Sequence, residues 1–65
     1  MPFISVKMLE GRTDEQKRKL VKAITDAMVE ICDARPESTT VLIEEHARDH
    51  WASGGVMVSN REKGK

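Results

Sequence analysis

Pro2 is the residue of this 65-residue chain with the clearest capacity for chemistry. A small second residue such as proline permits removal of the initiator methionine, so we expect Met1 to be absent from the mature chain. Pro2 would then carry a secondary amine at the N-terminus. Burial beside cationic side chains would lower the pKa of this amine toward neutrality, where it can act as a general base and its conjugate acid as a general acid. Pro2 alone also fits a structural role, as the stiff first residue of a β-strand.

The other groups with potential chemistry are one cysteine and two histidines. A lone cysteine cannot close a disulfide within the chain, and Cys32 falls on the apolar face of a predicted helix, so we expect it to be a small buried hydrophobe. His46 and His50 are four residues apart, a spacing that could present both to a metal on a helix. They fall in a predicted strand end and loop, without an HExxH order, so we expect no metal site and no cofactor.

The composition excludes several classes of partner. Eleven basic and eleven acidic residues cancel, and with one Trp, one Phe and no Tyr the chain lacks a base-stacking platform, so we expect no nucleic-acid partner. It also shows no signal peptide and no apolar run long enough to cross a bilayer. We therefore expect no membrane partner and a cytoplasmic location.

Two elements follow from the first half of the chain. Residues 2–9 alternate between apolar and polar side chains, as in a half-buried strand that Gly11 ends. Thr13 and Gln16 form a predicted capping box at the start of a helix that runs to about Asp33. The helix carries apolar residues at helical spacing, namely Leu20, Ile24, Ala27, Met28 and Ile31.

The second half begins with a break at Pro36 and a β-branched strand, Thr39–Glu45. We expect a polar loop over His46–Ser53, then a Gly54-Gly55 turn into a short strand at 56–58, and a mobile tail at 60–65. The predicted fold class is α+β: a single domain, residues 1–65, with two parallel strands, one long helix and a short C-terminal β-hairpin. Such a subunit leaves one sheet face and both sheet edges bare, so we expect it to form an oligomer.

The chain resembles the 4-oxalocrotonate tautomerase family in this order of elements and in three features: the terminal Pro2, the segment Leu9–Lys17 (LEGRTDEQK), and the Gly54-Gly55 pair after an aromatic residue. The family belongs to the tautomerase superfamily of enzymes with an N-terminal proline. The resemblance covers residues 2 to about 60 without an insertion. It implies the tautomerase fold, a homohexamer built as a trimer of dimers, and a place in the catabolism of aromatic compounds.

The resemblance also implies roles for three residues. Pro2 is the base that takes a proton from an enol hydroxyl or carbon and returns it to another carbon. Arg12 lies just past the end of the strand that begins with Pro2, in a turn that other subunits could abut, and holds a substrate carboxylate with its planar guanidinium group. Trp51 matches an aromatic residue that walls the active site, although packing between subunits would explain it as well.

One position departs from the pattern of the family. Well-studied members carry a second arginine early in the second strand, which polarises the substrate's keto oxygen from a neighbouring subunit, and the matching residue here is Thr40. A hydroxyl cannot balance a developing dienolate charge. Arg35, Arg48 and Arg61 are possible substitutes. The departure puts 2-hydroxymuconate in doubt as the physiological substrate.

The predicted function is a cofactor-independent keto–enol tautomerase for small anionic unsaturated 2-hydroxy or 2-keto acids. Two alternatives remain open. The chain could be a non-catalytic oligomeric module, or it could be a subunit of a hetero-oligomer whose partner supplies the second arginine.

Overall fold

The fold is described from a computed structural model, which describes the backbone of residues 2–63 and the side chains of residues 2–60. Strand β1 (Phe3–Leu9) leads into helix α1 (Asp14–Cys32), and a short 3-10 helix, η1 (Pro36–Ser38), leads into strand β2 (Thr40–His46). The chain continues through a second 3-10 helix, η2 (Arg48–His50), strands β3 (Ala52–Ser53) and β4 (Val56–Met57), and helix α2 (Val58–Lys63). The predicted small α+β fold, with two parallel strands, one long helix and a C-terminal hairpin, is confirmed.

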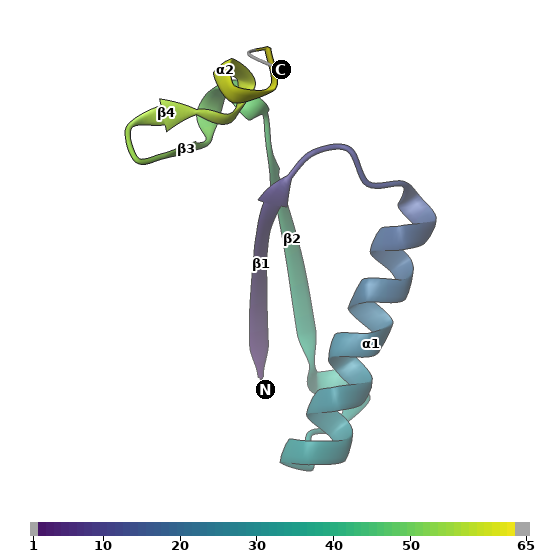
Figure 1. Cartoon of the computed structure of the whole chain (residues 1–65). Helices are drawn as coiled ribbons and strands as arrows, with labels where there is room; N and C mark the ends of the chain where they lie inside the picture. Colours follow the sequence, from purple (N-terminus) through teal and green to yellow (C-terminus); the bar gives the residue numbers. More distant parts are fainter. Residues whose placement is uncertain (1, 64–65) are drawn as a thin grey trace.

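Strands β1 and β2 form a parallel two-stranded sheet, which α1 covers on one side (Figure 1). Ile4 lies beside Val41 and Val6 beside Ile43, and these residues are half-buried on the helix side. Alternation along each strand sends the intervening side chains to the other side. There Phe3 is 62% exposed and Leu42 is 42% exposed. One sheet face is therefore uncovered in the single chain, as the sequence predicted.

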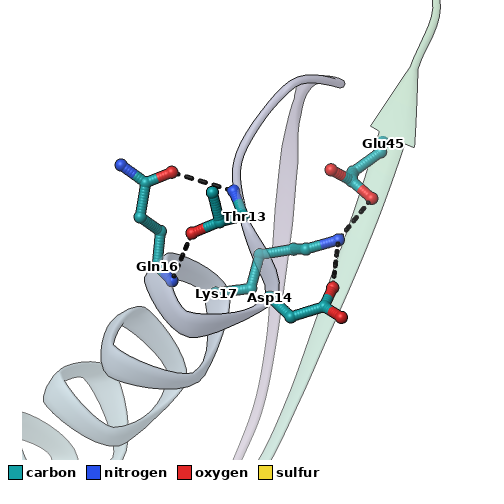
Figure 2. A network of polar contacts seen from close by, with 5 residues as sticks. All are labelled: Thr13, Asp14, Gln16, Lys17 and Glu45. Atoms are coloured by element: carbon teal, nitrogen blue, oxygen red, sulfur yellow. Dashed lines mark hydrogen bonds and ion pairs between the residues drawn. The ribbon is translucent and has the colours of Figure 1, made fainter.

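Helix α1 starts at the predicted capping box (Figure 2). The Gln16 backbone N–H donates to Thr13 Oγ1 at 3.1 Å, and the Thr13 backbone N–H donates to Gln16 Oε1 at 2.9 Å. The helix ends at Asp33, whose left-handed backbone (φ 60°) lets its N–H bond back to Met28 and Val29 carbonyls. Both boundaries lie within one residue of the prediction.

The last turn of α1 corrects one expectation. Ile31 is 80% exposed and Cys32 is exposed, so the prediction that Cys32 is buried is wrong for the single chain. This turn extends beyond the end of the sheet where β2 begins, and no strand lies beneath it (Figure 1). Periodicity placed these residues on the apolar face of the helix, but only the length of the sheet decides how much of that face is covered.

The C-terminal part contains more regular structure than the sequence indicated. Where a loop was predicted, η2 and β3 form, and β3 pairs with β4 around Gly54 and Gly55, which both have positive φ (60° and 79°). Helix α2 follows directly and overlaps the predicted tail, so this helix was not predicted from the sequence. Residues 64 and 65 lie outside the described residues.

No residue between positions 2 and 60 is fully buried. The apolar side chains between α1 and the sheet are only half-buried, because one helix and two strands cannot enclose them. None of the described helices is both long and apolar enough to cross a membrane.

Candidate active site

Pro2 lies directly before β1 and is partly exposed. Its carbonyl oxygen accepts a hydrogen bond of 2.9 Å from the backbone N–H of Thr40, the first residue of β2. This bond extends the parallel ladder by one residue and fixes Pro2 at the end of the sheet. Met1 lies outside the described residues, so its predicted removal is not addressed by the structure.

Arg12 lies at the other end of the sheet, in the connection between β1 and α1. Gly11 enters this turn with φ 128°, a backbone conformation that favours glycine. The Arg12 side chain is exposed and forms no hydrogen bond or ion pair with any of the described residues. Its guanidinium group is therefore available to an anion.

Pro2 and Arg12 are too far apart to share a substrate within one chain. The seven residues of β1 separate them. At a rise of about 3.3 Å per residue, Pro2 and Leu9 are roughly 23 Å apart, and Arg12 lies three residues further along the chain. Figure 1 shows the start of β1 and the start of the β1–α1 connection at opposite ends of the sheet. Within a single subunit Arg12 therefore does not reach Pro2, and only a neighbouring subunit could bring the two together.

Trp51 follows η2 and lies at the same end of the sheet as Arg12. Its ring is tilted by 57° against that of His46, the last residue of β2, with ring centroids 6.3 Å apart. Its carbonyl oxygen accepts a 2.8 Å hydrogen bond from the N–H of Val58, the first residue of α2. Trp51 is half-buried, so one part of its ring surface is packed and another is open.

Thr40, which stands where the family has its second arginine, and the possible substitutes for that arginine lie in different parts of the chain. Thr40 lies beside Phe3 in the register, next to Pro2. Arg35 precedes η1 near the same end, and its Nε lies 3.3 Å from Glu37 Oε2. Arg61 belongs to α2, but its side chain is outside the described part of the structure.

Arg48 is the replacement candidate that the structure places beside Arg12. It begins η2 and is half-buried. Its Nη2 atom lies 3.9 Å from the point where a Cβ on Gly11 would stand, so the guanidinium group covers the turn that carries Arg12. The sequence offered Arg48 only as one basic residue among several, because nothing in its spacing to Gly11 indicates this approach.

Comparison with known proteins agrees with this arrangement of elements. The family model described as tautomerase enzyme matches residues 2–61. The chain belongs to the tautomerase family. It is 52% identical over 62 residues to the 2-hydroxymuconate tautomerase of Bacillus subtilis, a match that covers 95% of this chain and all of the relative.

Two solved structures show the same fold. A structure from a study of the 4-oxalocrotonate tautomerase isozymes of Methylibium petroleiphilum superposes with a TM-score of 0.95 at 41% identity, covering 98% of this chain and 100% of that one. A heterohexameric 4-oxalocrotonate tautomerase from Chloroflexus aurantiacus superposes with a TM-score of 0.86 at 32% identity, covering 91% and 95%. The resemblance inferred from the sequence is confirmed, and membership in the family supports an isomerase-type enzyme.

This tautomerase also has an open groove of about 250 Å³ between α1 and β2, away from Pro2 and Trp51. It is lined by Asp14, Lys17, Arg18, Val21 and Ile43. Lys17 Nζ donates to Glu45 Oε1 at 2.9 Å and lies 3.7 Å from Asp14 Oδ1 (Figure 2). The hydrogen bond to Glu45, helped by the negative charges of Glu45 and Asp14 and opposed by desolvation, raises the pKa of Lys17 above its ordinary value of 10.5. The lysine is thus held in ion pairs that join α1 to β2.

The two histidines of the tautomerase do not form part of a metal-binding cluster. Over the described residues, no three His, Cys, Asp or Glu side chains are placed to hold one ion. His46 packs against Trp51, and His50 Nε2 lies 3.9 Å from Asp49 Oδ1.

Proposed function

We propose that this tautomerase interconverts the enol and keto forms of small unsaturated 2-hydroxy and 2-keto acids without a cofactor, with the amine of Pro2 as general acid and base. The observation that supports this proposal most directly is the position of Pro2. It is partly exposed at the start of β1, and the Thr40 N–H holds its carbonyl oxygen. The ring nitrogen therefore lies at the end of a strand whose position is fixed, as a base needs if it is to meet a bound substrate.

The proposed reaction moves one proton. The neutral Pro2 amine takes the proton from the enol hydroxyl, and the electron pair of the O–H bond becomes the π bond of the carbonyl. The displaced C=C π pair takes the proton back from the protonated amine and forms the new C–H bond, at C3 in a simple enol or at C5 in a conjugated dienol, so the amine ends neutral. Arg12 binds the substrate carboxylate through its guanidinium group, and Trp51 supplies an apolar wall that excludes water.

We propose that the site is completed only in an oligomer, a homohexamer arranged as a trimer of dimers. In the single chain, Pro2 and Arg12 lie at opposite ends of β1 and no described residue is fully buried. In the sheet, β1 pairs with β2 and has its other edge open. If two β1 strands paired antiparallel along this edge, the Pro2 end of one subunit would lie beside the Arg12 end of the other.

A second candidate follows from Thr40. This residue replaces the arginine that the family resemblance places there, and a relative from Chloroflexus aurantiacus is a heterohexamer. A hetero-oligomer with a partner that supplies the missing cation would satisfy the same chemistry. If neither assembly turns over a substrate, the chain is a non-catalytic oligomeric module.

Two measurements test the proposed function. Intact mass spectrometry of the protein from its native host should show loss of Met1, since an acylated Pro2 nitrogen cannot act as a base. Purified protein without Met1 should then ketonise phenylenolpyruvate, a monoacid enol, and 2-hydroxymuconate, a dicarboxylate, well above the buffer rate. A matched protein with one extra residue before Pro2 should be inactive. Absence of ketonisation by protein that has lost Met1 would reject the enzyme in its homo-oligomeric form.

The titration of Pro2 gives an independent measurement. We expect NMR of ¹⁵N-labelled proline to report a pKa for the Pro2 amine below that of free proline amide, because cationic side chains and an apolar wall disfavour the charged form. A pKa at or above that of proline amide would contradict the assignment of Pro2 as the base.

A further inference from the structure

We propose that Arg48 is a second substrate-binding arginine, which acts beside Arg12 and makes the site selective for dicarboxylates over monocarboxylates. The inference rests on the proposed function, since it assigns the substrate class of the same site. It is carried by the placement of Arg48 against the turn that holds Arg12.

The first step is geometric. Arg48 Nη2 lies 3.9 Å from the Cβ position of Gly11, and Gly11 has no side chain to separate the guanidinium group from the turn. Consecutive Cα atoms are about 3.8 Å apart, so Arg48 Nη2 is at most roughly 9 Å from the Cα of Arg12. One small molecule with two carboxylates can contact Arg48 Nη2 and the Arg12 guanidinium group together, because the Arg12 side chain is long enough to span this distance and has no partner among the described residues.

The second step concerns the other charged groups at this end of the sheet. Glu45 is bound by Lys17 at 2.9 Å, so neither is available to a ligand. Asp49 lies 3.9 Å from His50 Nε2. Glu10, which precedes Gly11 in the turn, is exposed. Arg12 and Arg48 bring two guanidinium groups to this turn, so two carboxylates of one ligand can each meet an arginine there, whereas a monocarboxylate needs only one.

The third step concerns how well Arg48 is held. It is half-buried in η2 and already makes an interaction within the chain. A guanidinium group presents five N–H donors, so Arg48 can keep that interaction and still donate to a carboxylate. A held arginine loses less conformational freedom on binding than an exposed one, which favours a role in recognition.

Together these points identify what could replace the missing arginine. Thr40 offers a hydroxyl at the Pro2 end of the sheet, whereas Arg48 places a guanidinium group, which already makes one interaction within the chain, at the end that carries Arg12 and Trp51. In the proposed oligomer, Arg12 would bind one carboxylate of the substrate and Arg48 the other.

Calorimetric binding tests the inference without requiring turnover. The probes are cis,cis-muconate, a dicarboxylate, and cinnamate, a monocarboxylate, and the protein is the assembled form without Met1. Arg48→Ala should weaken muconate binding about 10- to 100-fold, the range expected for a hydrogen bond to a charged group, and cinnamate binding by less than about 3-fold. Arg18→Ala is the matched control, since Arg18 is an exposed arginine that lines the groove on α1, and it should leave both affinities unchanged.

A conservative variant separates recognition from a structural role. Arg48→Lys keeps the positive charge and most of the side-chain stem, so it should assemble normally even if Arg48→Ala does not, and it should weaken muconate binding selectively but less than alanine does. An equal loss of affinity for both probes in Arg48→Lys, or no loss for either, would overturn the inference.

The outcome for Arg48 can be distinguished from the outcome for the proposed function. If wild-type protein does not ketonise either enol but Arg48 variants lose muconate selectively, the enzyme proposal fails and the dicarboxylate site stands. If wild type is active and the Arg48 variants keep the wild-type ratio of muconate to cinnamate affinity, the enzyme proposal stands and the role of Arg48 is rejected.

Discussion

At the scale of single residues, the proposed chemistry depends on groups fixed at the two ends of one strand. The Thr40 N–H holds Pro2 at the start of β1, and Gly11 allows the chain to turn so that Arg12 faces solvent at the other end. Trp51 and Arg48 join Arg12 because η2 follows the end of β2. Each residue alone has an ordinary structural explanation, and the chemical role arises from their arrangement.

The first residue-scale prediction concerns Arg12. Arg12→Ala should lower kcat/KM by about 10²- to 10³-fold for both phenylenolpyruvate and 2-hydroxymuconate, because each substrate has a carboxylate that this guanidinium group holds through binding and into the transition state. Steady-state kinetics measure the effect, with Arg18→Ala as the control that should stay near wild type. A change in Arg12→Ala of less than about 3-fold would remove this residue from the proposed site.

The second residue-scale prediction concerns the departure at position 40. In the Arg48→Ala background, Thr40→Arg should recover part of the lost kcat/KM for 2-hydroxymuconate and leave phenylenolpyruvate turnover nearly unchanged, because it returns one positive charge near Pro2. Kinetics on the single and double variants give the coupling between the two positions. Additive effects with no recovery would mean that positions 40 and 48 do not serve the same substrate group.

At the scale of elements, α1 is joined to the sheet by polar contacts as well as by its half-buried side chains. The capping box fixes the start of α1. Lys17, the residue after Gln16 of this box, reaches Glu45 near the end of β2 (Figure 2). Side chains of Lys17 and Glu45 are 25% and 28% exposed, so this pair is better shielded from solvent than the Lys19–Glu15 pair, at 78% and 70%. We infer that it sets the position of α1 and of the turn that carries Arg12.

The element-scale prediction uses the pH dependence of this pair. Folding raises the pKa of Lys17 above 10.5, so the protonated form is favoured in the folded state. The contribution of the Lys17–Glu45 pair to folding stability is therefore fully present below the pKa of Lys17 in the unfolded chain. This contribution is lost as the pH rises through the higher pKa of Lys17 in the folded chain. Lys17→Met should lower Tm at pH 7, and the difference from wild type should shrink above about pH 10.5. Thermal unfolding at pH 7 and above about pH 10.5 measures this difference in Tm.

The control is Lys19→Met, which should lower Tm less than Lys17→Met does at pH 7. An equal loss of Tm in the two variants would contradict the role of Lys17.

At the scale of the whole molecule, the single chain does not enclose a core. No described residue is fully buried, and large apolar side chains remain exposed on the sheet, on α1 and on the hairpin. Sixty-five residues bury too little surface to be stable without partners in such a shape. Assembly therefore serves stability as well as the proposed site.

The whole-molecule prediction is a test of a site shared between subunits. Light scattering should give a mass several times 7.3 kDa. The variant with an extra residue before Pro2 keeps Arg12, and Arg12→Ala keeps Pro2. When the two inactive proteins are refolded together in equal amounts, half of the Pro2 amines and half of the Arg12 side chains are intact. Random assembly places both intact groups in about a quarter of the shared sites, so about a quarter of wild-type activity should return. A site within one chain would show no recovery, and a stable monomer would reject the assembly.

The sequence by itself determined the two parallel strands, the long helix with its capping box, and the family. These features depend on local patterns: alternation along 2–9, helical spacing after Thr13, and the short links between elements. Each pattern acts over a few residues, and the structure places the boundaries of α1, β1 and β2 within one residue of them. The sequence could not show α2, whose polar residues lack an apolar period.

Only the tertiary structure decided which residues lie together. A strand seven residues long separates Pro2 from Arg12, although the resemblance places both in one site. Cys32 lies on the apolar face of α1 but beyond the end of the sheet, so it is exposed. Arg48 meets the Gly11 turn because β1 and β2 end side by side and η2 follows. The physical reason is the same in each case: strand pairing and the length of the sheet set these distances, and neither can be read from local spacing.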